Sequence, residues 1–262
     1  MRAEESATAA VAGEERSSAE PVVAVEDLER SFGDLEVLDG VSFDVAPSSV
    51  TCLVGSNGSG KTTLLRIVAG LLAADAGTVR IDATGERPVG YLAQRPDFRH
   101  QFTVTETLDF YGDLLATEVD VAATLDRVGL GPVQDRRVGA LSGGMIRLLG
   151  IAQATLGDPR VLVLDEPSSG LDPTVTRHVR GVIDDLGGSG RSIVLATHDL
   201  GTVERVADQV LVLDDGAIAA RGTPDDLTEA TGTDALADAV PELLGGSGPV
   251  SVSAGRRRGE DA

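Results

Sequence analysis

The residues best suited to chemistry lie in one short run between an apolar stretch and a helix-like one. Glycines in the run allow backbone N–H groups to turn inward as a nest for an anion, and the next helix adds positive charge at its N-terminus. The spacing G-x-x-x-x-G-K-[ST] is that of a phosphate-binding loop. We expect Lys61 to reach the β- and γ-phosphates of ATP and the Thr62 hydroxyl to bind Mg²⁺. The loop comprises Gly55, Ser56, Asn57, Gly58, Ser59, Gly60, Lys61, Thr62 and Thr63.

A pair of carboxylates, Asp165 and Glu166, follows the apolar run 161–164. A buried strand that ends there brings both side chains to the carboxyl edge of a sheet, close to the phosphate-binding loop. We predict that Asp165 holds Mg²⁺ through its hydration shell. Glu166 then orients and polarises the attacking water.

The run Leu141-Ser142-Gly143-Gly144-Met145, called the signature motif below, opens a helix-like segment. It suits an anion again, because Ser142 is a good helix cap and the glycines expose N–H groups. With these motifs in order over residues 22–230, the chain resembles the ATP-binding subunits of ABC transporters, whose signature is LSGGQ. The resemblance implies that Ser142, Gly143 and Gly144 contact ATP held by a partner. Two subunits, in a homodimer or a heterodimer with another ABC ATPase subunit, then sandwich two ATP molecules.

The resemblance assigns roles to four further residues. Gln94 matches a glutamine that senses Mg²⁺ and the attacking water and links to the membrane subunits. His198 matches a histidine that contacts the γ-phosphate, and Asp172 matches a loop at the dimer interface. Phe32 matches an aromatic that stacks on adenine, a contact of about 1–3 kcal/mol. A core role at the end of a strand stays open for Phe32.

The resemblance also implies a peripheral ATPase at the cytoplasmic face of the membrane, which drives integral membrane permease subunits through ATP-dependent dimer closure. Met145 replaces the usual Gln, as in ATPases of ABC-2-type exporters, and few residues follow His198, unlike in sugar importers; both features favour export. The stretch between Gln94 and Leu141 is short and lacks sustained heptads, unlike chromosome-maintenance members. A non-transport ABC ATPase, such as an iron–sulfur assembly ATPase, is the alternative.

Four aromatic residues, Phe98, Phe102, Phe110 and Tyr111, lie close after Gln94 in a chain with only 3% aromatics. We predict that they form a docking patch for the membrane subunits. Phe110 and Tyr111 sit at helical spacing, and a core role for these two stays equally open.

The elements that must position these residues alternate between apolar strand-like runs and helix-like stretches. Uninterrupted Val and Leu runs are typical of strands buried on both faces, as in a parallel sheet covered by helices. We predict an α/β fold. The resemblance implies a P-loop NTPase with a RecA-like, mostly parallel core sheet and an N-terminal antiparallel β subdomain. It also implies a helical subdomain, at about 95–157, that carries the signature motif. Gly150 in that subdomain costs a helix about 1 kcal/mol relative to Ala, which is typical of close packing. The strands are expected at 22–28, 41–45, 48–55, 78–82, 88–94, 160–166, 192–198 and 209–216, and the helices at 61–72, 105–116, 119–129, 142–157, 173–186 and 200–207.

The length of 262 residues fits one large domain. We place this ATPase domain at 21–244, between a tail at 1–20 and a tail at 245–262 that we expect to be disordered. The single cysteine, Cys52, allows no internal disulfide. The chain has no apolar signal core at its start and no run of 18 apolar residues, so we expect neither a signal peptide nor a membrane span.

The chain is strongly acidic, with a net charge of −20 and a pI of about 4.4. Phosphate backbones repel such a chain, which argues against nucleic-acid binding. Of the 22 basic residues, only Lys61 is a lysine. An acidic surface nearly free of lysine favours work in a salt-rich cytoplasm, as in a halophilic archaeon, where ions screen the self-repulsion. A high-GC genome that favours Arg codons is the alternative explanation.

Overall fold

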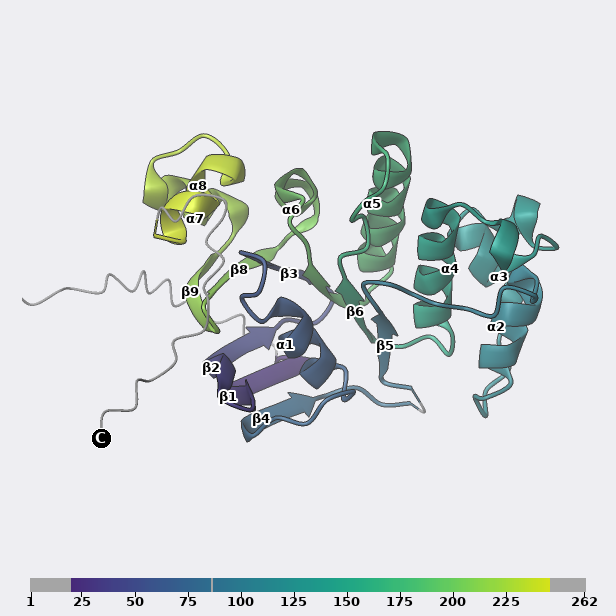
Figure 1. The fold of residues 1–262 in the computed structure, drawn as a ribbon, viewed down its shortest axis with the longest axis horizontal. Coiled ribbons are helices and arrows are strands. Elements are labelled where there is room, and N and C mark those ends of the chain that lie inside the picture. Colours follow the sequence, from purple (N-terminus) through teal and green to yellow (C-terminus); the bar gives the residue numbers. More distant parts are fainter. Residues whose placement is uncertain (1–19, 86, 246–262) are drawn as a thin grey trace, which may run out of the picture.

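The computed structural model describes residues 20–85 and 87–245, so the predicted tails lie almost entirely outside the described residues. Helix α1 (Lys61–Val68) lies between two sheets (Figure 1). Its apolar face packs on both sheets at once. The phosphate-binding loop immediately before α1 is thereby held at the junction of the two sheets.

The larger sheet has the strand order β5-β6-β7-β3-β8-β9. Neighbouring strands are parallel except for the last pair, β8 with β9. This arrangement confirms the predicted, mostly parallel core sheet. Its strands are β3 (Val50–Gly55), β5 (Val89–Leu92), β6 (Val161–Asp165), β7 (Ser192–Ala196), β8 (Gln209–Asp214) and β9 (Ala217–Gly222).

Both faces of this sheet are covered, as the apolar runs predicted. In β6, Val161 and Val163 pack on the side of α1 and the smaller sheet, whereas Leu162 and Leu164 pack into the core on the other side. That second core includes residues of the helices α4 (Gly143–Thr155), α5 (Pro173–Gly188) and α6 (Leu200–Val206). Successive side chains of a strand point to opposite faces, so a run without polar residues requires two apolar layers.

The smaller sheet has the order β2-β1-β4 and is antiparallel. It confirms the predicted N-terminal antiparallel part. Its strands run further than the sequence suggested, because their outer halves alternate exposed polar residues with buried ones and lack a continuous apolar run. The strands are β1 (Val23–Phe32), β2 (Leu35–Val45) and β4 (Ala76–Ile81).

The stretch predicted to be helical at about 95–157 contains α2 (Val104–Gly112), α3 (Val121–Arg127), the 3₁₀ turns η1 (Gly131–Val133) and η2 (Val138–Ala140), and α4. These helices gather at one end of the molecule (Figure 1). Thr103 and Glu106 form a capping box that fixes the start of α2. Among the described residues, no helix has both the length and the apolar character needed to cross a membrane.

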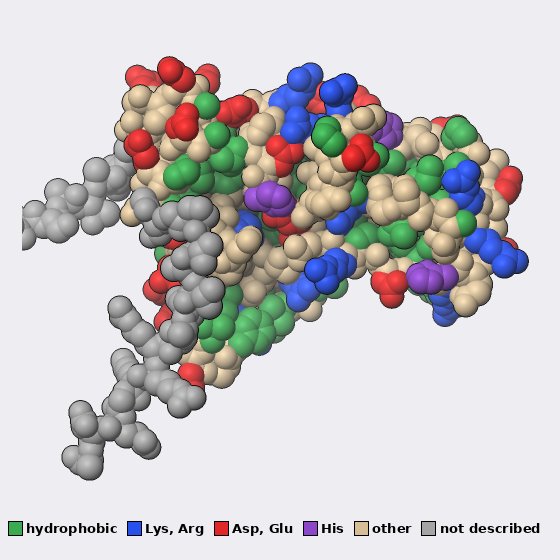
Figure 2. All heavy atoms as spheres, turned by 45° about the horizontal axis from the view of Figure 1, so that its top comes forward, with side chains coloured by type: hydrophobic (Ala, Val, Ile, Leu, Met, Phe, Trp, Pro, Cys, Tyr) green, Lys and Arg blue, Asp and Glu red, His purple; other side chains and the backbone are tan. Residues whose placement is uncertain are grey.

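Two short helices near the C-terminus, α7 (Pro224–Thr231) and α8 (Leu236–Leu243), were not predicted. Helix α8 packs beside α6, where the Leu236 backbone N–H donates a hydrogen bond to Glu204 Oε1 at 2.8 Å. The exposed side chains here are strongly acidic, and Figure 2 shows red side chains gathered at this end of the molecule. They belong to Asp225, Asp226, Glu229, Asp234, Asp238 and Glu242.

Candidate functional site

The phosphate-binding loop connects β3 to α1 and borders a pocket of about 260 Å³. Most of the residues that line this pocket were predicted to bind nucleotide or metal. They come from the loop, from the end of β6 and from the segment after β5. The lining residues are Val37, Asn57, Gly58, Gly60, Lys61, Thr62, Thr63, Gln94, Asp165 and Glu166.

Two loop positions admit only glycine. Gly55 and Gly60 have φ values of 153° and 102°, a region that side chains disfavour. A Cβ atom on Gly55 would lie 2.0 Å from the Leu213 carbonyl oxygen, and one on Gly60 would lie 2.7 Å from the Val37 carbonyl oxygen. The loop therefore lies directly against the backbones of β8 and β2.

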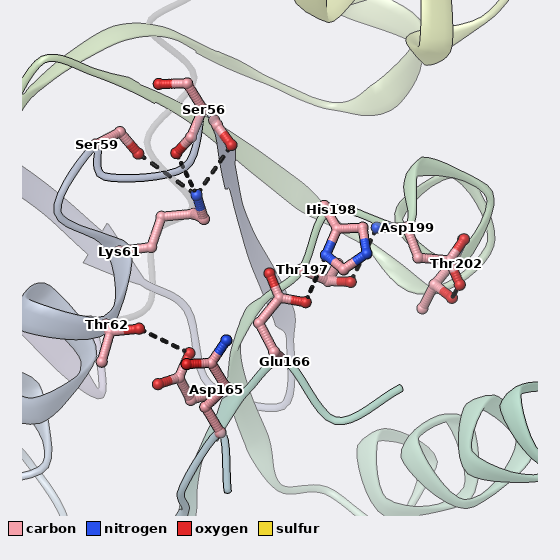
Figure 3. A network of polar contacts seen from close by, with 12 residues as sticks. Ser56, Ser59, Lys61, Thr62, Asp165, Glu166, Thr197, His198, Asp199 and Thr202 are labelled. Atoms are coloured by element: carbon pink, nitrogen blue, oxygen red, sulfur yellow. Dashed lines mark hydrogen bonds and ion pairs between the residues drawn. The ribbon is translucent and has the colours of Figure 1, made fainter. Parts of the chain in front are cut away.

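The Lys61 side chain points back toward the loop, and its ammonium is hydrogen-bonded to loop atoms. Its Nζ atom donates hydrogen bonds to the carbonyl oxygens of Gly55 and Ser56 at 2.9 and 2.7 Å, and Ser59 Oγ lies 3.5 Å away (Figure 3). Burial lowers the pKa of Lys61, and the neighbouring carboxylates Glu166 and Asp165 oppose that shift. A partly desolvated cation held at the loop by backbone carbonyl oxygens is well placed to bind phosphate oxygens.

Asp165 lies at the end of β6, opposite the loop. The Thr62 hydroxyl donates a hydrogen bond to Asp165 Oδ1 at 3.2 Å (Figure 3). The other carboxylate oxygen of Asp165, Oδ2, is buried and has no hydrogen-bond partner. Burial raises the pKa of Asp165, and the Thr62 hydrogen bond counteracts part of this rise. A buried oxygen without a partner is suited to a cation or to a water molecule of its hydration shell.

The side of the pocket that carries Asp165 has the chemistry of a Mg²⁺ site. Thr62, Gln94 and Asp165 all line it and offer hydroxyl, amide and carboxylate oxygens. Among the described residues, no group of three or more His, Cys, Asp or Glu forms a protein-only metal cage. Mg²⁺ in phosphate sites uses one or two protein ligands together with waters and substrate phosphates, so these residues fit it.

Glu166 and His198 meet across two neighbouring strands. Asp165 of β6 pairs with Ala196 of β7, which brings the residues just beyond these strand ends together. His198 Nδ1 lies 2.8 Å from Glu166 Oε2 (Figure 3). Burial raises the pKa of Glu166, and His198 and Lys61 act against this rise. Glu166 also has a φ of 50°, a strained value for a residue with a side chain.

The turn that carries His198 has support that the sequence did not indicate. The Asp199 N–H donates to Thr197 Oγ1 at 3.0 Å, and Asp199 caps α6. Arg180 of α5 binds both carboxylate oxygens of Asp199, at 2.8 and 2.7 Å. Burial would raise the pKa of Asp199, but the hydrogen bonds from Arg180 and Thr202 outweigh it and lower the pKa.

The signature motif lies at the start of α4 and contributes no residue to the pocket. Ser142 caps the helix by accepting a hydrogen bond from the Met145 N–H at 3.3 Å, and it is exposed. The two glycines differ. Gly143 is exposed with open space at its Cβ position, whereas a Cβ on Gly144 would lie 2.6 Å from Val175 Cγ1. The structure therefore gives Gly144 a packing role that the sequence did not reveal.

Asp172 lies near the signature motif rather than the pocket. It is exposed and caps α5, accepting hydrogen bonds from the Thr174 and Val175 N–H groups at 2.9 and 3.1 Å. Because Val175 packs on Gly144, the starts of α4 and α5 are in contact. Together they form an exposed edge that carries both the signature motif and Asp172.

Arg147 is a residue of this region that the sequence analysis missed. It lies on α4, is buried, and donates to the carbonyl oxygens of Ala93, at 3.4 Å, and of Gln94. An arginine among the apolar residues of a buried helix is the only sequence signal for it. The same helix approaches the Gln94 segment closely at Gly150, where a Cβ atom would lie 2.6 Å from Leu92 Cδ1. The close packing predicted at Gly150 is thereby confirmed.

Phe32 is 47% exposed, which excludes the alternative of a core aromatic. It ends β1 and pairs with Leu35 at the start of β2, the strand that also contributes Val37 to the pocket. The Arg30 guanidinium stacks over one side of its ring, with Cζ 4.6 Å from the centroid. The exposed ring offers a surface for stacking.

The four aromatic residues after Gln94 form one cluster of edge-to-face contacts. Phe98 and Tyr111 are partly buried against the main core, whereas Phe110 is 38% exposed. The Arg99 guanidinium lies over the Phe102 and Phe110 rings, 5.2 and 4.9 Å from their centroids. The core alternative therefore holds for Tyr111 and not for Phe110.

Comparisons with known proteins agree with this geometry. Residues 38–169 match the family model described as ABC transporter. An uncharacterised ABC transporter ATP-binding protein of Bacillus subtilis is 35% identical over 86% of this chain and 79% of its own length. Nod factor export ATP-binding protein I of Ralstonia nicotianae is also 35% identical, over 85% of this chain and 75% of its own.

Solved structures of ABC transporter ATP-binding subunits have the same fold. The ATP-binding subunit of an ABC transporter superposes with a TM-score of 0.75 at 26% identity, over 85% of this chain and 99% of that one. An ATP-binding cassette in its ADP conformation has a TM-score of 0.74 at 26% identity, over 87% of this chain and 99% of its own.

Proposed function

Since the chain belongs to the family of ABC transporter ATP-binding subunits, whose ATPase domains hydrolyse ATP, we propose that it powers export through separate membrane subunits by ATP-dependent closure of a dimer. The ATPase domain spans residues 21–244. The name of the Nod factor export relative supports export, and it favours transport over iron–sulfur assembly.

In the proposed reaction, residues 55–63 hold the phosphates of ATP, with Lys61 reaching the β- and γ-phosphates, and Phe32 stacks on the adenine. Glu166 orients and polarises the attacking water, and His198 holds Glu166 and contacts the γ-phosphate. Thr62, Gln94 and Asp165 hold Mg²⁺, which when bound neutralises charge on the phosphates. Charge stabilisation in the pocket supplies most of the rate enhancement.

The position of Ser142 is the observation that supports the proposed dimer. It caps a helix whose N-terminus can bind an anion, yet it is exposed and does not line the pocket that holds Lys61 and Glu166. A second subunit placed head to tail supplies Ser142 and Gly143 to this pocket, and Asp172 lies at the same edge. We take the second subunit to be another copy of this chain, because most soluble oligomers are symmetric homo-oligomers.

Mixing two inactive variants tests the composite site. Lys61→Ala damages the loop, and Ser142→Arg blocks the signature motif, so each variant alone has two damaged sites per dimer. A mixed dimer has one site with both defects and one intact site. An equimolar mixture should therefore recover about a quarter of the wild-type activity if the sites act independently. ATPase assays of the separate and mixed variants, with melting curves to confirm folding, measure this recovery, and no recovery from folded variants would reject the composite site.

The outer part of the aromatic cluster, in which Arg99 and Phe110 are exposed and Phe102 is half-buried, is the proposed docking patch for the membrane subunits. It lies just beyond Gln94, so movement at the site is transmitted over a short distance. Docking there places the chain at the cytoplasmic face of the membrane as a peripheral subunit. Copurification with a membrane protein, lost in Phe110→Asp and kept in the matched exposed variant Leu71→Asp, tests the patch.

A further inference from the structure

Helix α4 packs directly on the segment that leads to Gln94. The absence of a side chain at Gly150 allows Leu92 and Pro96 to approach the helix, since a Cβ atom would lie 2.6 Å from Leu92 and 3.2 Å from Pro96. The signature motif at the start of α4 and the Gln94 segment are therefore parts of one packed unit. We therefore expect a displacement of α4 to shift this segment.

Arg147 adds a polar connection to this packing. Its guanidinium donates to the carbonyl oxygens of Ala93 and Gln94. Among the described residues it forms no ion pair, although it is buried. Burial lowers the pKa of Arg147, and the charges of Asp165 and Glu166 oppose that shift without forming an ion pair with it. Such a buried charge does not by itself favour stability. A lysine would keep the charge toward these carboxylates, so the hydrogen bonds to the Gln94 segment are what distinguish arginine from lysine here.

We propose that Arg147 is a positioning residue that fixes Gln94 relative to α4. When the signature motif of one subunit contacts the ATP of the partner, Arg147 then sets the position of Gln94 in the pocket of that same first subunit. The inference rests on the proposed roles of Gln94 toward Mg²⁺ and of Ser142 toward ATP. Groups that orient a metal ligand typically change metal affinity 10- to 100-fold when they are removed.

The chain offers a matched control in Arg87. Its Nη1 atom also donates to two backbone carbonyl oxygens, those of Gln153 and Leu156, at 2.9 and 3.1 Å. These lie at the opposite end of α4 from the signature motif. Arg87 thus makes the same kind of hydrogen bonds to α4, but they hold the end of the helix away from the Gln94 segment, so its loss reports a structural effect.

The experiment compares full-length Arg147→Met, Arg147→Lys, Arg87→Met and Gln94→Ala with the wild type. The first measurement is the Mg²⁺ concentration that gives half-maximal binding of a fluorescent ATP analogue, which does not depend on turnover. The second is amide hydrogen exchange of residues 93–97. We expect Arg147→Met to raise the half-maximal Mg²⁺ concentration about 10-fold and to speed exchange. Arg147→Lys should recover part of the change, because one ammonium donates fewer hydrogen bonds than a guanidinium.

Arg87→Met should lower the melting temperature and leave both measurements unchanged. If Gln94→Ala raises the Mg²⁺ requirement and Arg147→Met does not, the positioning role of Arg147 is overturned while the proposed site stands. If Gln94→Ala has no effect either, the proposed metal role of Gln94 fails, and the inference fails with it. If Arg147→Met does not fold, Arg147→Lys decides by the same criteria.

Discussion

His198 Nδ1 and Glu166 Oε2 lie 2.8 Å apart, although 32 positions separate the two residues in the chain. The parallel register of β6 and β7 brings them together at one sheet edge. The Glu166 side chain is only 8% exposed, whereas that of His198 is 61% exposed. The carboxylate is thus largely shielded from water while the imidazole is exposed, so the chemistry and the stability of the site can be tested separately at Glu166.

Glu166→Gln is expected to bind ATP and hydrolyse little of it. The amide keeps the shape of the side chain but cannot polarise water as a carboxylate does. A general base contributes about 10²–10⁴-fold, so we expect kcat to fall at least 100-fold while the ATP dissociation constant changes less than about threefold. Steady-state ATPase assays and equilibrium binding measure the two quantities. Full turnover by the variant would reject Glu166 as the catalytic carboxylate.

The same substitution is expected to stabilise the fold at neutral pH. Burial raises the pKa of Glu166, with His198 and Lys61 opposing it. A carboxyl whose pKa is higher in the folded chain than in the unfolded chain favours folding at low pH, and this contribution is lost as the pH rises through the ordinary carboxyl range to the folded pKa. Glu166→Gln should therefore gain about 1–3 kcal/mol in the free energy of unfolding at pH 7 and little at about pH 4.

Urea unfolding at both pH values measures this difference, with the exposed Glu229→Gln on α7 as the matched control. The control should show no such dependence on pH. An equal effect of Glu166→Gln at both pH values would show that the buried charge does not oppose folding.

Lys61→Arg should abolish hydrolysis although it keeps the positive charge. Lys61 Nζ fits between the carbonyl oxygens of Gly55 and Ser56, at 2.9 and 2.7 Å, inside a loop packed against two strands. A planar guanidinium is larger and does not fit between these two carbonyl oxygens in the same way. Loss of one donor that stabilises developing negative charge typically costs about 10²–10³ in kcat, and we expect at least this loss here. Arg221→Lys on the edge strand β9 makes the reverse exchange and should keep activity; ATPase assays compare the two.

The sequence predicted those parts of the site that are contiguous in the chain. The phosphate-binding loop and the Asp165–Glu166 pair are local patterns, and the strands that carry them consist of apolar runs because both of their faces are buried. Strand β9 was not predicted because it is short, lies at the edge of the sheet and has no run of buried apolar residues. Helix α8 was not predicted because it contains Pro241. The exposed Phe32 and the packing role of Gly144 also required the structure.

The contacts that hold the site residues in place could not be predicted from the sequence for a different reason. Arg147 meets Gln94 across 53 positions of the chain, and Arg180 meets Asp199 across 19. No local periodicity specifies such pairs, because the register of a helix against a distant loop depends on the packing of the whole core. For Arg147, the signal is a buried arginine inside an otherwise apolar helix. Arg180 is half-buried on the polar helix α5 and has no such signal.

Salt should stabilise the chain if its acidity reflects a salt-rich cytoplasm. The described residues 222–245 carry the exposed acidic side chains of α7 and α8 and no Lys or Arg. The Debye length falls from about 10 Å at 0.1 M salt to about 3 Å at 1 M, which screens this repulsion. Each kcal/mol relieved should raise Tm by about 2–4 °C in KCl. Asp238→Asn with Glu242→Gln should reduce this dependence, and melting curves that do not change with KCl would favour the alternative of Arg-rich codon usage.

Gly144→Ala is expected to destabilise the start of α4 through Val175, whereas Gly143→Ala should not. A Cβ on Gly144 would lie 2.6 Å from Val175 Cγ1, and a Cβ on Gly143 would meet nothing within 4 Å. Overpacking of this kind costs about 1–3 kcal/mol. The double variant Gly144→Ala, Val175→Ala removes the clash and should recover stability relative to Val175→Ala alone, a coupling that urea unfolding measures. Because Val175 lies in the first turn of α5 after Asp172, the clash should also displace the edge that we propose to meet the second subunit. A Gly144→Ala variant that loses activity with full stability would instead place a ligand, and not Val175, at this glycine.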